Sequence, residues 1–307
     1  MATGAAAVTT AAPIAKSAGA VGSGHFKYLL IAPAVFILLA FGLFPFLYSV
    51  VVSFQKLSLL DQYTDFQGLL NYRRLLHDQR LWSAVLHTVG ITAVALPIQL
   101  VFGLLLAHHF LDERPLKRLF VALLIIPSVI SPMVAGSMWR LMFDDRYGPI
   151  NQMIGWVLGE HVSILWTIQA AWAYPAIIIC DVWEWTPFMF IILLAALANV
   201  DREQLDAAAI DGANRWQMFR YVSLPAIWPV MMIALLIRGL DLIRLFDIVW
   251  QLTRGGPGNA TETISIYMFV RGFQEFETSY TGAMVVALIV LFTVALVTAL
   301  RRMEIAR

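Results

Sequence analysis

Charged residues interrupt long apolar segments of this chain, where a charge needs a partner or a water-filled cavity. Between residues 162 and 200, the only charged residues are Asp181 and Glu184, and the next charge is Asp201. A second set alternates in sign at three-residue spacing: Arg238, Asp241, Arg244 and Asp247. On insertion scales, a charge in the middle of a membrane costs about 2.5–3.5 kcal/mol. Such residues therefore indicate either internal ion pairs or a polar site.

Two interpretations of these charges are open. Residues three apart lie on one face of a helix, so the alternating set can form an ion ladder within its own helix. Alternatively, carboxyl groups beside aromatic rings are typical of sugar sites, where rings stack on the sugar and planar polar groups hold hydroxyls. Trp183, Trp185 and Phe188 lie next to the acidic pair. For Arg244 and Asp247, the interpretation as an ion ladder and the interpretation as part of a sugar site stay equally open.

Composition places the whole chain in a membrane. Of the 307 residues, 60% are hydrophobic and 13% are charged, whereas soluble domains carry about 25% charged residues. The mean hydropathy is +0.76, and the formal net charge of +1 gives no basic surface for nucleic acid. The single cysteine, Cys180, excludes an internal disulfide and a cysteine-cluster metal site. These values exclude a soluble enzyme and a nucleic-acid binder and predict an all-α integral membrane protein.

The apolar segments predict six transmembrane helices, because a span needs about 20 apolar residues. Between 162 and 200, we expect residues 162–174 to form an interfacial or buried scaffold, with Pro175 opening one span. Trp166 and Trp172 suit the headgroup region. Prolines at 127, 132, 175 and 187 are expected to bend helices. The expected spans are 28–54, 81–111, 119–139, 175–200, a segment beginning at 221, and 278–300.

Lysine and arginine are more frequent in the segments that lie inside when the N-terminus is cytoplasmic. The positive-inside rule therefore predicts that both termini are cytoplasmic. Residues 1–24 are almost entirely small residues and predict a disordered cytoplasmic tail. The six-helix domain is then residues 25–307.

A polar loop at residues 201–225 separates the fourth and fifth spans. Its pattern predicts two short helices joined at Gly212, because Leu205, Ala208 and Ala209 share one face and aromatic residues follow the glycine. Pro225 is expected to end the second helix. Physics alone leaves two interpretations open: the loop docks into a partner's groove, or it folds back on its own spans.

The same loop resembles the EAA loop of ABC importer permeases. The family pattern is Glu-Ala-Ala, three residues, Gly, nine residues, Ile-x-Leu-Pro. Here Asp206 replaces the glutamate, Val222 replaces the isoleucine, and Gly212 and Pro225 match. Asp211-Gly212-Ala213, Pro229, Phe246-Asp247 and Gly255-Gly256-Pro257 resemble the carbohydrate branch. From residue 28 onward, the chain is similar to the first-permease subunit of maltose/trehalose-type importers of the bacterial inner membrane.

That resemblance implies a coupling helix that docks on a separate, dimeric ATP-binding subunit. The chain has no Gly-Lys pair and so no P-loop, and ATP and Mg²⁺ are expected on that partner. No cofactor, resident metal or catalytic residue is expected in this chain. Further implied partners are a second homologous permease, a periplasmic or lipoprotein sugar-binding protein and membrane lipid. The coupling residues carried over are Asp206, Ala207, Ala208, Asp211, Gly212 and Leu224.

The resemblance also implies a sugar site on the fourth and fifth spans. The matching positions are Glu184, Trp185, Phe188, Arg238, Asp241, Leu242 and Leu245. Leu242 and Leu245 replace polar residues of the maltose-type site, so the sugar itself is left open. The alternative function is a secondary carrier driven by a proton or ion gradient, with Asp181, Glu184 and Asp241 as the relay.

Overall fold

A computed structural model describes residues 23–57, 65–112 and 115–305, and almost all regular structure in these ranges is helical. The chain divides into two units, Met1–Val51 and Val52–Arg307. Most of the expected N-terminal tail, residues 1–22, lies outside the described residues. Its last two residues, Ser23 and Gly24, belong to the first turn of α1 (Ser23–Leu38).

The described part of the first unit is helical: α1 continues through a π-helical turn, η1 (Leu39–Leu43), into α2 (Phe44–Ser53), whose last two residues belong to the second unit. The wide turn ends two residues before Pro45, whose missing N–H and bulky ring disturb a regular α-helix. The continuous apolar helix Tyr28–Ser53 is long enough to cross a membrane, as the sequence predicted.

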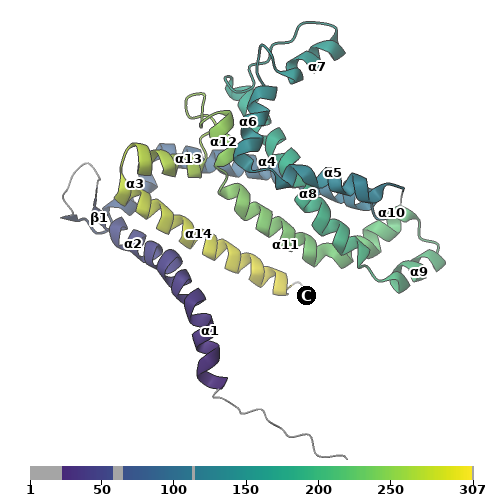
Figure 1. Cartoon of the computed structure of the whole chain (residues 1–307), viewed down its shortest axis with the longest axis horizontal. Helices are drawn as coiled ribbons and strands as arrows, with labels where there is room; N and C mark the ends of the chain where they lie inside the picture. Colours follow the sequence, from purple (N-terminus) through teal and green to yellow (C-terminus); the bar gives the residue numbers. More distant parts are fainter. Residues whose placement is uncertain (1–22, 58–64, 113–114, 306–307) are drawn as a thin grey trace, which may run out of the picture. The chain divides into compact units, whose positions relative to one another are not determined.

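Four further helices of the second unit have the length and apolar composition of a span. Figure 1 shows α4, α8, α11 and α14, and α4 packs extensively along α8, with α11 against both. Their bounds are Gln79–His109 for α4, Ala170–Ala198 for α8, Leu224–Ile243 for α11 and Thr278–Ile305 for α14. These bounds agree to within a few residues with the expected segments at 81–111, from 221 onward and at 278–300, whereas α8 begins earlier than expected.

The expected third span is not one straight helix. It consists of α5 (Lys117–Val129) and α6 (Pro132–Met142), which meet at an angle of 96°. Ile130 and Ser131 between them are extended, because the residue before a proline is driven out of the helical region. The bend expected at Pro132 is therefore confirmed, whereas Pro127 lies inside α5. The described residues hold five span-length helices, or six when this bent pair counts as one span.

The helix α8 begins at Ala170, so the prediction that Pro175 opens the span was wrong. The helix also passes through Pro187 without a break. A proline removes only its own hydrogen-bond donor, and neighbouring helices compensate in the packed interior of a membrane protein. Trp166 is buried, and its indole donates to Asn151, which agrees with the buried scaffold expected here.

Short elements connect the long helices (Figure 1). Strands β1 (Gln55–Lys56) and β2 (Asp65–Phe66) pair antiparallel, with Gln55 opposite Phe66. The connecting helices are α3 (Leu70–His77), α7 (Pro149–Leu158), α12 (Asp247–Leu252), α13 (Ile264–Phe269) and the π-turn η3 (Val270–Gln274).

Close packing fixes α4 against α8 at Gly103. A Cβ at this position would lie 2.6 Å from the Cβ of Met189 and 3.1 Å from its backbone. Only glycine permits this approach, because the obstacle is the rigid part of the neighbouring helix. The two helices that carry the polar residues described next are thus held in one register.

Candidate functional site

A buried cluster of three polar residues joins α4, α8 and α11. The guanidinium Nη2 of Arg238 lies 2.5 Å from Oδ1 of Asp181, and its Nε donates to Oε1 of Gln99 at 3.0 Å. The amide of Gln99 donates in turn to Oδ2 of Asp181 at 2.6 Å. All three side chains are buried. The cluster forms a closed ring of hydrogen bonds, which satisfies most of the polar atoms that it takes out of water.

This cluster corrects the ion-ladder interpretation for Arg238, whose partner is on a different helix. Asp247 cannot extend an ion ladder along α11 either, because α11 ends at Ile243 and Asp247 begins the separate helix α12. One rung exists: Arg244 pairs with Asp241 at 2.9 Å. Sequence reasoning did not select Gln99, although a glutamine in the middle of an apolar helix was a usable signal.

Two aromatic rings lie beside the buried arginine. The guanidinium carbon of Arg238 is 4.6 Å from the centroid of the Trp185 ring, a cation–π distance. Trp185 contacts Phe188 edge to face, with centroids 6.2 Å apart. Both rings are partly exposed. The structure therefore brings Arg238, Trp185 and Phe188 together, as the sequence analysis expected.

Glu184 is buried, and neither of its carboxyl oxygens has a hydrogen-bond partner. The indole N–H of Trp139, on α6, is also buried without a partner, and the ring of Trp139 contacts that of Trp183. Buried polar groups without partners are rare in proteins and call for an explanation. Here one residue supplies acceptors and the other supplies a donor.

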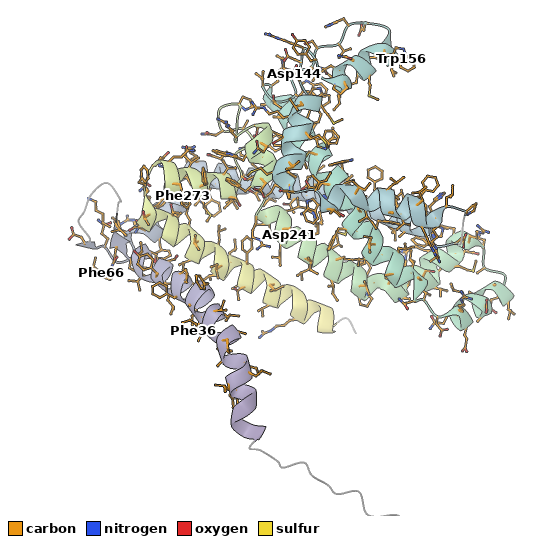
Figure 2. The ribbon with its side chains drawn as sticks, in the orientation of Figure 1. Phe36, Phe66, Asp144, Trp156, Asp241 and Phe273 are labelled. Atoms are coloured by element: carbon orange, nitrogen blue, oxygen red, sulfur yellow. The ribbon has the colours of Figure 1, made fainter. Side chains whose placement is uncertain are left out.

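The remaining expected site residues differ in exposure. Asp241 is partly exposed at the end of α11 (Figure 2), whereas Leu242 and Leu245 are buried, with 0% and 8% of their surfaces exposed. Leu245 belongs to a core cluster that includes Ile248 and Trp139. The structure thus places Asp241 near solvent and the two leucines in the packed interior.

The loop at 201–225 forms two short helices, as predicted. Helix α9 (Arg202–Ile210) is capped by the Asp201 carboxylate, and α10 (Arg215–Met218) begins with a capping box between Asn214 and Gln217. Between them Gly212 has a φ of +80°, a conformation that side chains rarely adopt. Sequence pattern and structure agree on a tight glycine turn.

Pro225 does not end the second helix, contrary to the prediction. A π-helical turn, η2 (Phe219–Ser223), joins α10 directly to α11, and Pro225 lies in the first turn of α11. The wider turn accommodates a proline that would clash with a regular α-helical carbonyl. The loop is consequently attached to the fifth span by continuous helix.

The expected coupling residues divide by exposure. Leu205 and Leu224 pack against the core cluster of the spans. The exposed surface of the loop carries Asp206, Ala207, Asp211 and Gly212, with Ile210 at 86% and Trp216 at 69% exposed. Ala208 is partly buried. The loop therefore both folds against its own spans and presents apolar and acidic residues outward.

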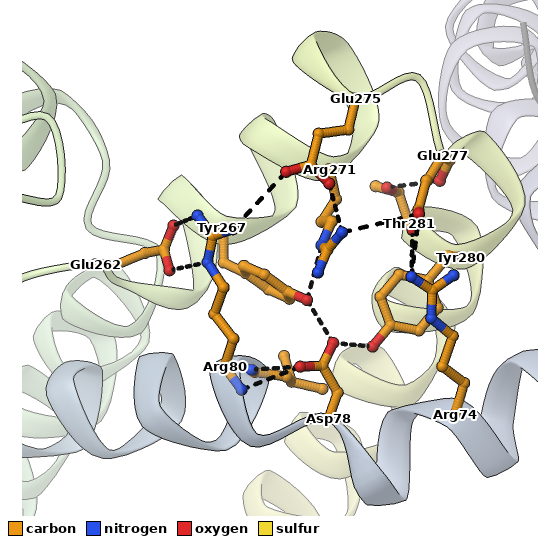
Figure 3. A network of polar contacts seen from close by, with 11 residues as sticks. Arg74, Asp78, Arg80, Glu262, Tyr267, Arg271, Glu275, Glu277, Tyr280 and Thr281 are labelled. Carbon is orange, nitrogen blue, oxygen red and sulfur yellow. Dashed lines mark hydrogen bonds and ion pairs between the residues drawn. The ribbon is translucent and has the colours of Figure 1, made fainter. Parts of the chain in front are cut away.

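A polar network that sequence analysis missed joins α3, α4, α13, η3 and α14 (Figure 3). At its centre, Oδ2 of Asp78 accepts hydrogen bonds from the hydroxyls of Tyr267 and Tyr280. Oδ1 of Asp78 accepts hydrogen bonds from the backbone N–H groups of Arg80 and Leu81, so Asp78 also caps the N-terminus of α4. Nearby ion pairs are Arg74–Glu277 and Arg80–Glu262.

Electrostatics keep this network in one protonation state. Burial opposes ionisation of Asp78, but the two tyrosine hydroxyls and the backbone amide of Leu81 outweigh it, so the pKa of Asp78 is lowered. Burial, followed by the hydrogen bond to Asp78, raises the pKa of Tyr267 to about 12. At neutral pH the aspartate is therefore the acceptor and Tyr267 the donor.

Comparison with known proteins gives consistent matches. Residues 99–303 match the family model of the binding-protein-dependent transport system inner membrane component. A trehalose/maltose transport system permease protein of Thermococcus litoralis is 34% identical over 79% of this chain and 81% of its own length. A lactose transport system permease protein of Rhizobium radiobacter is 32% identical over 89% of this chain and 92% of its own.

A solved structure shares the fold. The chain matches a subunit of a bacterial alginate ABC transporter with a TM-score of 0.78 and 21% identity, over 90% of this chain and 92% of that one. These comparisons do not support the alternative of a secondary carrier. Family model, relatives and fold agree, and the chain belongs to the binding-protein-dependent inner membrane components, as the permease of a carbohydrate ABC importer.

Proposed function

We propose that this permease has six spans, with both termini in the cytoplasm, and forms one half of a transport pathway. The bent pair α5–α6 counts as the third span, and the excess of lysine and arginine in the inner segments supports the orientation. The permease domain comprises residues 25–307, and the apolar outer faces of its spans contact lipid. A second, homologous permease supplies the other wall of the pathway.

The loop α9–Gly212–α10 is the contact with a dimeric ATP-binding subunit, which holds ATP and Mg²⁺. Its inner face is fixed to the spans through Leu205 and Leu224, and its outer face is free to dock. Continuous helix from α10 through η2 into α11 gives a stiff link. Movement of the loop is therefore transmitted to the span that carries Arg238 and Asp241.

The sugar site comprises Glu184, Trp185, Phe188, Arg238, Asp241, Leu242 and Leu245. Partly exposed rings of Trp185 and Phe188 offer faces for stacking, and Glu184 offers two unpartnered acceptors. Four residues of this site are buried in this structure, so their contact with sugar requires the helices that cover them to move: Glu184, Arg238, Leu242 and Leu245. That requirement fits alternating access, in which the cavity opens to one side at a time.

A periplasmic or lipoprotein sugar-binding protein delivers the sugar from outside. One structure with the same fold is an alginate transporter in complex with an alginate pentasaccharide-bound periplasmic protein. Binding of ATP closes the ATPase dimer, moves the loop and turns the cavity outward, and hydrolysis resets it. This chain performs no covalent chemistry.

The exposed, glycine-hinged loop is the observation that carries the ATP-driven mechanism. The test is purification of the tagged chain from its native membrane in mild detergent, followed by mass identification and uptake by proteoliposomes. The expected result is co-purification of a P-loop ATPase and a second permease, and sugar uptake that requires ATP. Recovery of this chain alone, with uptake that follows an imposed proton gradient, would overturn the proposal.

A further inference from the structure

We infer that the site selects an uncharged saccharide, and that Asp181 and Gln99 set this selectivity by occupying Arg238. The inference rests on the proposed sugar site. An arginine in a sugar site is the natural receptor for a carboxylate, sulfonate or phosphate, because its planar fork binds two oxygens at once. Whether this arginine is free therefore decides between neutral and acidic sugars.

Arg238 is not free. Its Nη2 is 2.5 Å from Asp181, its Nε is 3.0 Å from Gln99, and one face lies against Trp185. Only 2% of the residue is exposed. An anionic ligand would have to displace Asp181, which is itself completely buried and would then lack a counter-ion. Gln99 reinforces the pair by donating to Asp181 at 2.6 Å.

The two arginines of α11 and its C-terminal end, the cations named in the site analysis, already have carboxylate partners. Arg238 is neutralised by Asp181, and Arg244 is paired with Asp241 at 2.9 Å. The group left over is the carboxyl of Glu184, which is neutral or negative. An acidic sugar buried here would thus carry an uncompensated charge, which proteins avoid.

The unpartnered atoms match hydroxyl groups instead. An ionised Glu184 needs donors for its two oxygens, a neutral Glu184 needs one donor and one acceptor, and the Trp139 indole N–H needs an acceptor. A sugar hydroxyl is both donor and acceptor, so a polyhydroxyl molecule satisfies either residue. An ionised carboxylate, sulfonate or phosphate accepts only and would repel an ionised Glu184. The unpartnered atoms thus call for a polyhydroxyl molecule, and the charge balance calls for one without an ionised group.

The first test identifies the cargo by charge. Proteoliposomes with the complete complex and its binding protein receive a mixture of sugars, polyols, and their aldonic acids, uronic acids and phosphate esters. Mass spectrometry then identifies what accumulates only with ATP. Accumulation of an uncharged compound is the expected result. Accumulation of an acidic compound overturns the inference but leaves sugar import standing, whereas no accumulation at all overturns the proposed function as well.

The second test asks whether Asp181 sets the selectivity. In Asp181→Asn the guanidinium loses its counter-ion, so competition by the acidic analogue of the cargo, relative to that by a neutral analogue, should rise about tenfold. Asp145→Asn, a charge removal in the loop between α6 and α7, is the matched control and should leave the ratio unchanged. Should Asp181→Asn fail to assemble, Gln99→Leu frees the Nε of Arg238 and should shift the ratio in the same direction. An unchanged ratio in an assembled variant contradicts the assignment.

Discussion

The guanidinium of Arg238 and the carboxylate of Asp181 lie 2.5 Å apart in the packing between α11 and α8. Both side chains are almost entirely buried, and Gln99 of α4 bonds to each of them. The cluster ties together the helix linked to the coupling loop and the two helices that pack most closely. It therefore links the proposed sugar site to the structural core.

Breaking this pair should destabilise the protein strongly. Asp181→Ala or Arg238→Met leaves a buried charge without its partner, which costs about 3–5 kcal/mol. The double variant removes both charges and should lose less than the sum of the two. Thermal unfolding of the purified complex measures the cycle. The exposed pair Asp241–Arg244 is the control, since surface pairs contribute about 0–1 kcal/mol. Additive losses for the buried pair would contradict direct coupling.

Gly103 and Gly90 lie on the same helix but in different surroundings. At Gly103 an added Cβ meets the rigid part of Met189, whereas at Gly90 nothing lies within 4 Å. Gly103→Ala should destabilise the complex by about 1–3 kcal/mol, because α4 and α8 must separate. Gly90→Ala should be neutral or slightly stabilising, because alanine favours helix. Equal unfolding temperatures for the two variants would show that the close approach at Gly103 does not matter.

Gly212 should control coupling between ATP hydrolysis and transport. Gly212→Val meets no neighbouring atom, but its φ of +80° costs a side chain about 1–2 kcal/mol. The turn between α9 and α10 then relaxes, and ATP hydrolysed per sugar transported should rise about fivefold or more. Gly258→Val introduces similar strain at an open position with φ +62° in a different loop, and should not change this ratio. A fully coupled Gly212→Val complex would count against the docking role.

The Asp78 network predicts a specific dependence of stability on pH. The pKa of Asp78 is lowered in the folded protein, so its contribution is complete above the ordinary value of 3.8 and is lost as pH falls through the folded value. Asp78→Ala should lower the free energy of unfolding by about 2 kcal/mol at neutral pH. The difference in unfolding free energy between wild type and variant should then narrow below about pH 4.

The control for this experiment is Asp201→Ala, since Asp201 caps α9 but the described residues give it no tyrosine donors. Asp201→Ala should lower the free energy of unfolding by about 1 kcal/mol. Unfolding midpoints between pH 7 and pH 3 measure both variants. A gap between wild type and Asp78→Ala that widens at low pH would contradict the lowered pKa.

Much of the fold followed from the sequence because long apolar segments and loop residues carry local signals. The long apolar helices, the two-helix loop and the bend before Pro132 all followed from composition and spacing. Predictions that treated proline as a helix boundary were wrong at Pro175 and Pro225. There, tertiary packing and a π-helical turn offset the missing hydrogen bond, and neither effect is visible in local sequence.

The site was harder to predict because its decisive contacts join distant parts of the chain. Spacing allowed an ion pair of Arg238 along its own helix, but Asp181 and Gln99 reach it from α8 and α4. The Asp78 network similarly gathers Tyr267 and Tyr280 from distant segments. By contrast, the grouping of Glu184 with Trp185 and Phe188 on one helix was predictable from spacing alone.

The most direct test of the proposed sugar site is ATP-driven uptake by Glu184→Ala and Asp241→Ala, measured together with assembly of the complex. Glu184→Ala removes two carboxyl oxygens that have no hydrogen-bond partner, and Asp241→Ala removes a partly exposed carboxylate. Neither change therefore removes a contact of the buried Arg238–Asp181 pair. Uptake should fall about a hundredfold, while co-purification of the partner subunits stays at the wild-type level. Wild-type uptake by both variants, or a loss of assembly equal to the loss of uptake, would contradict the account.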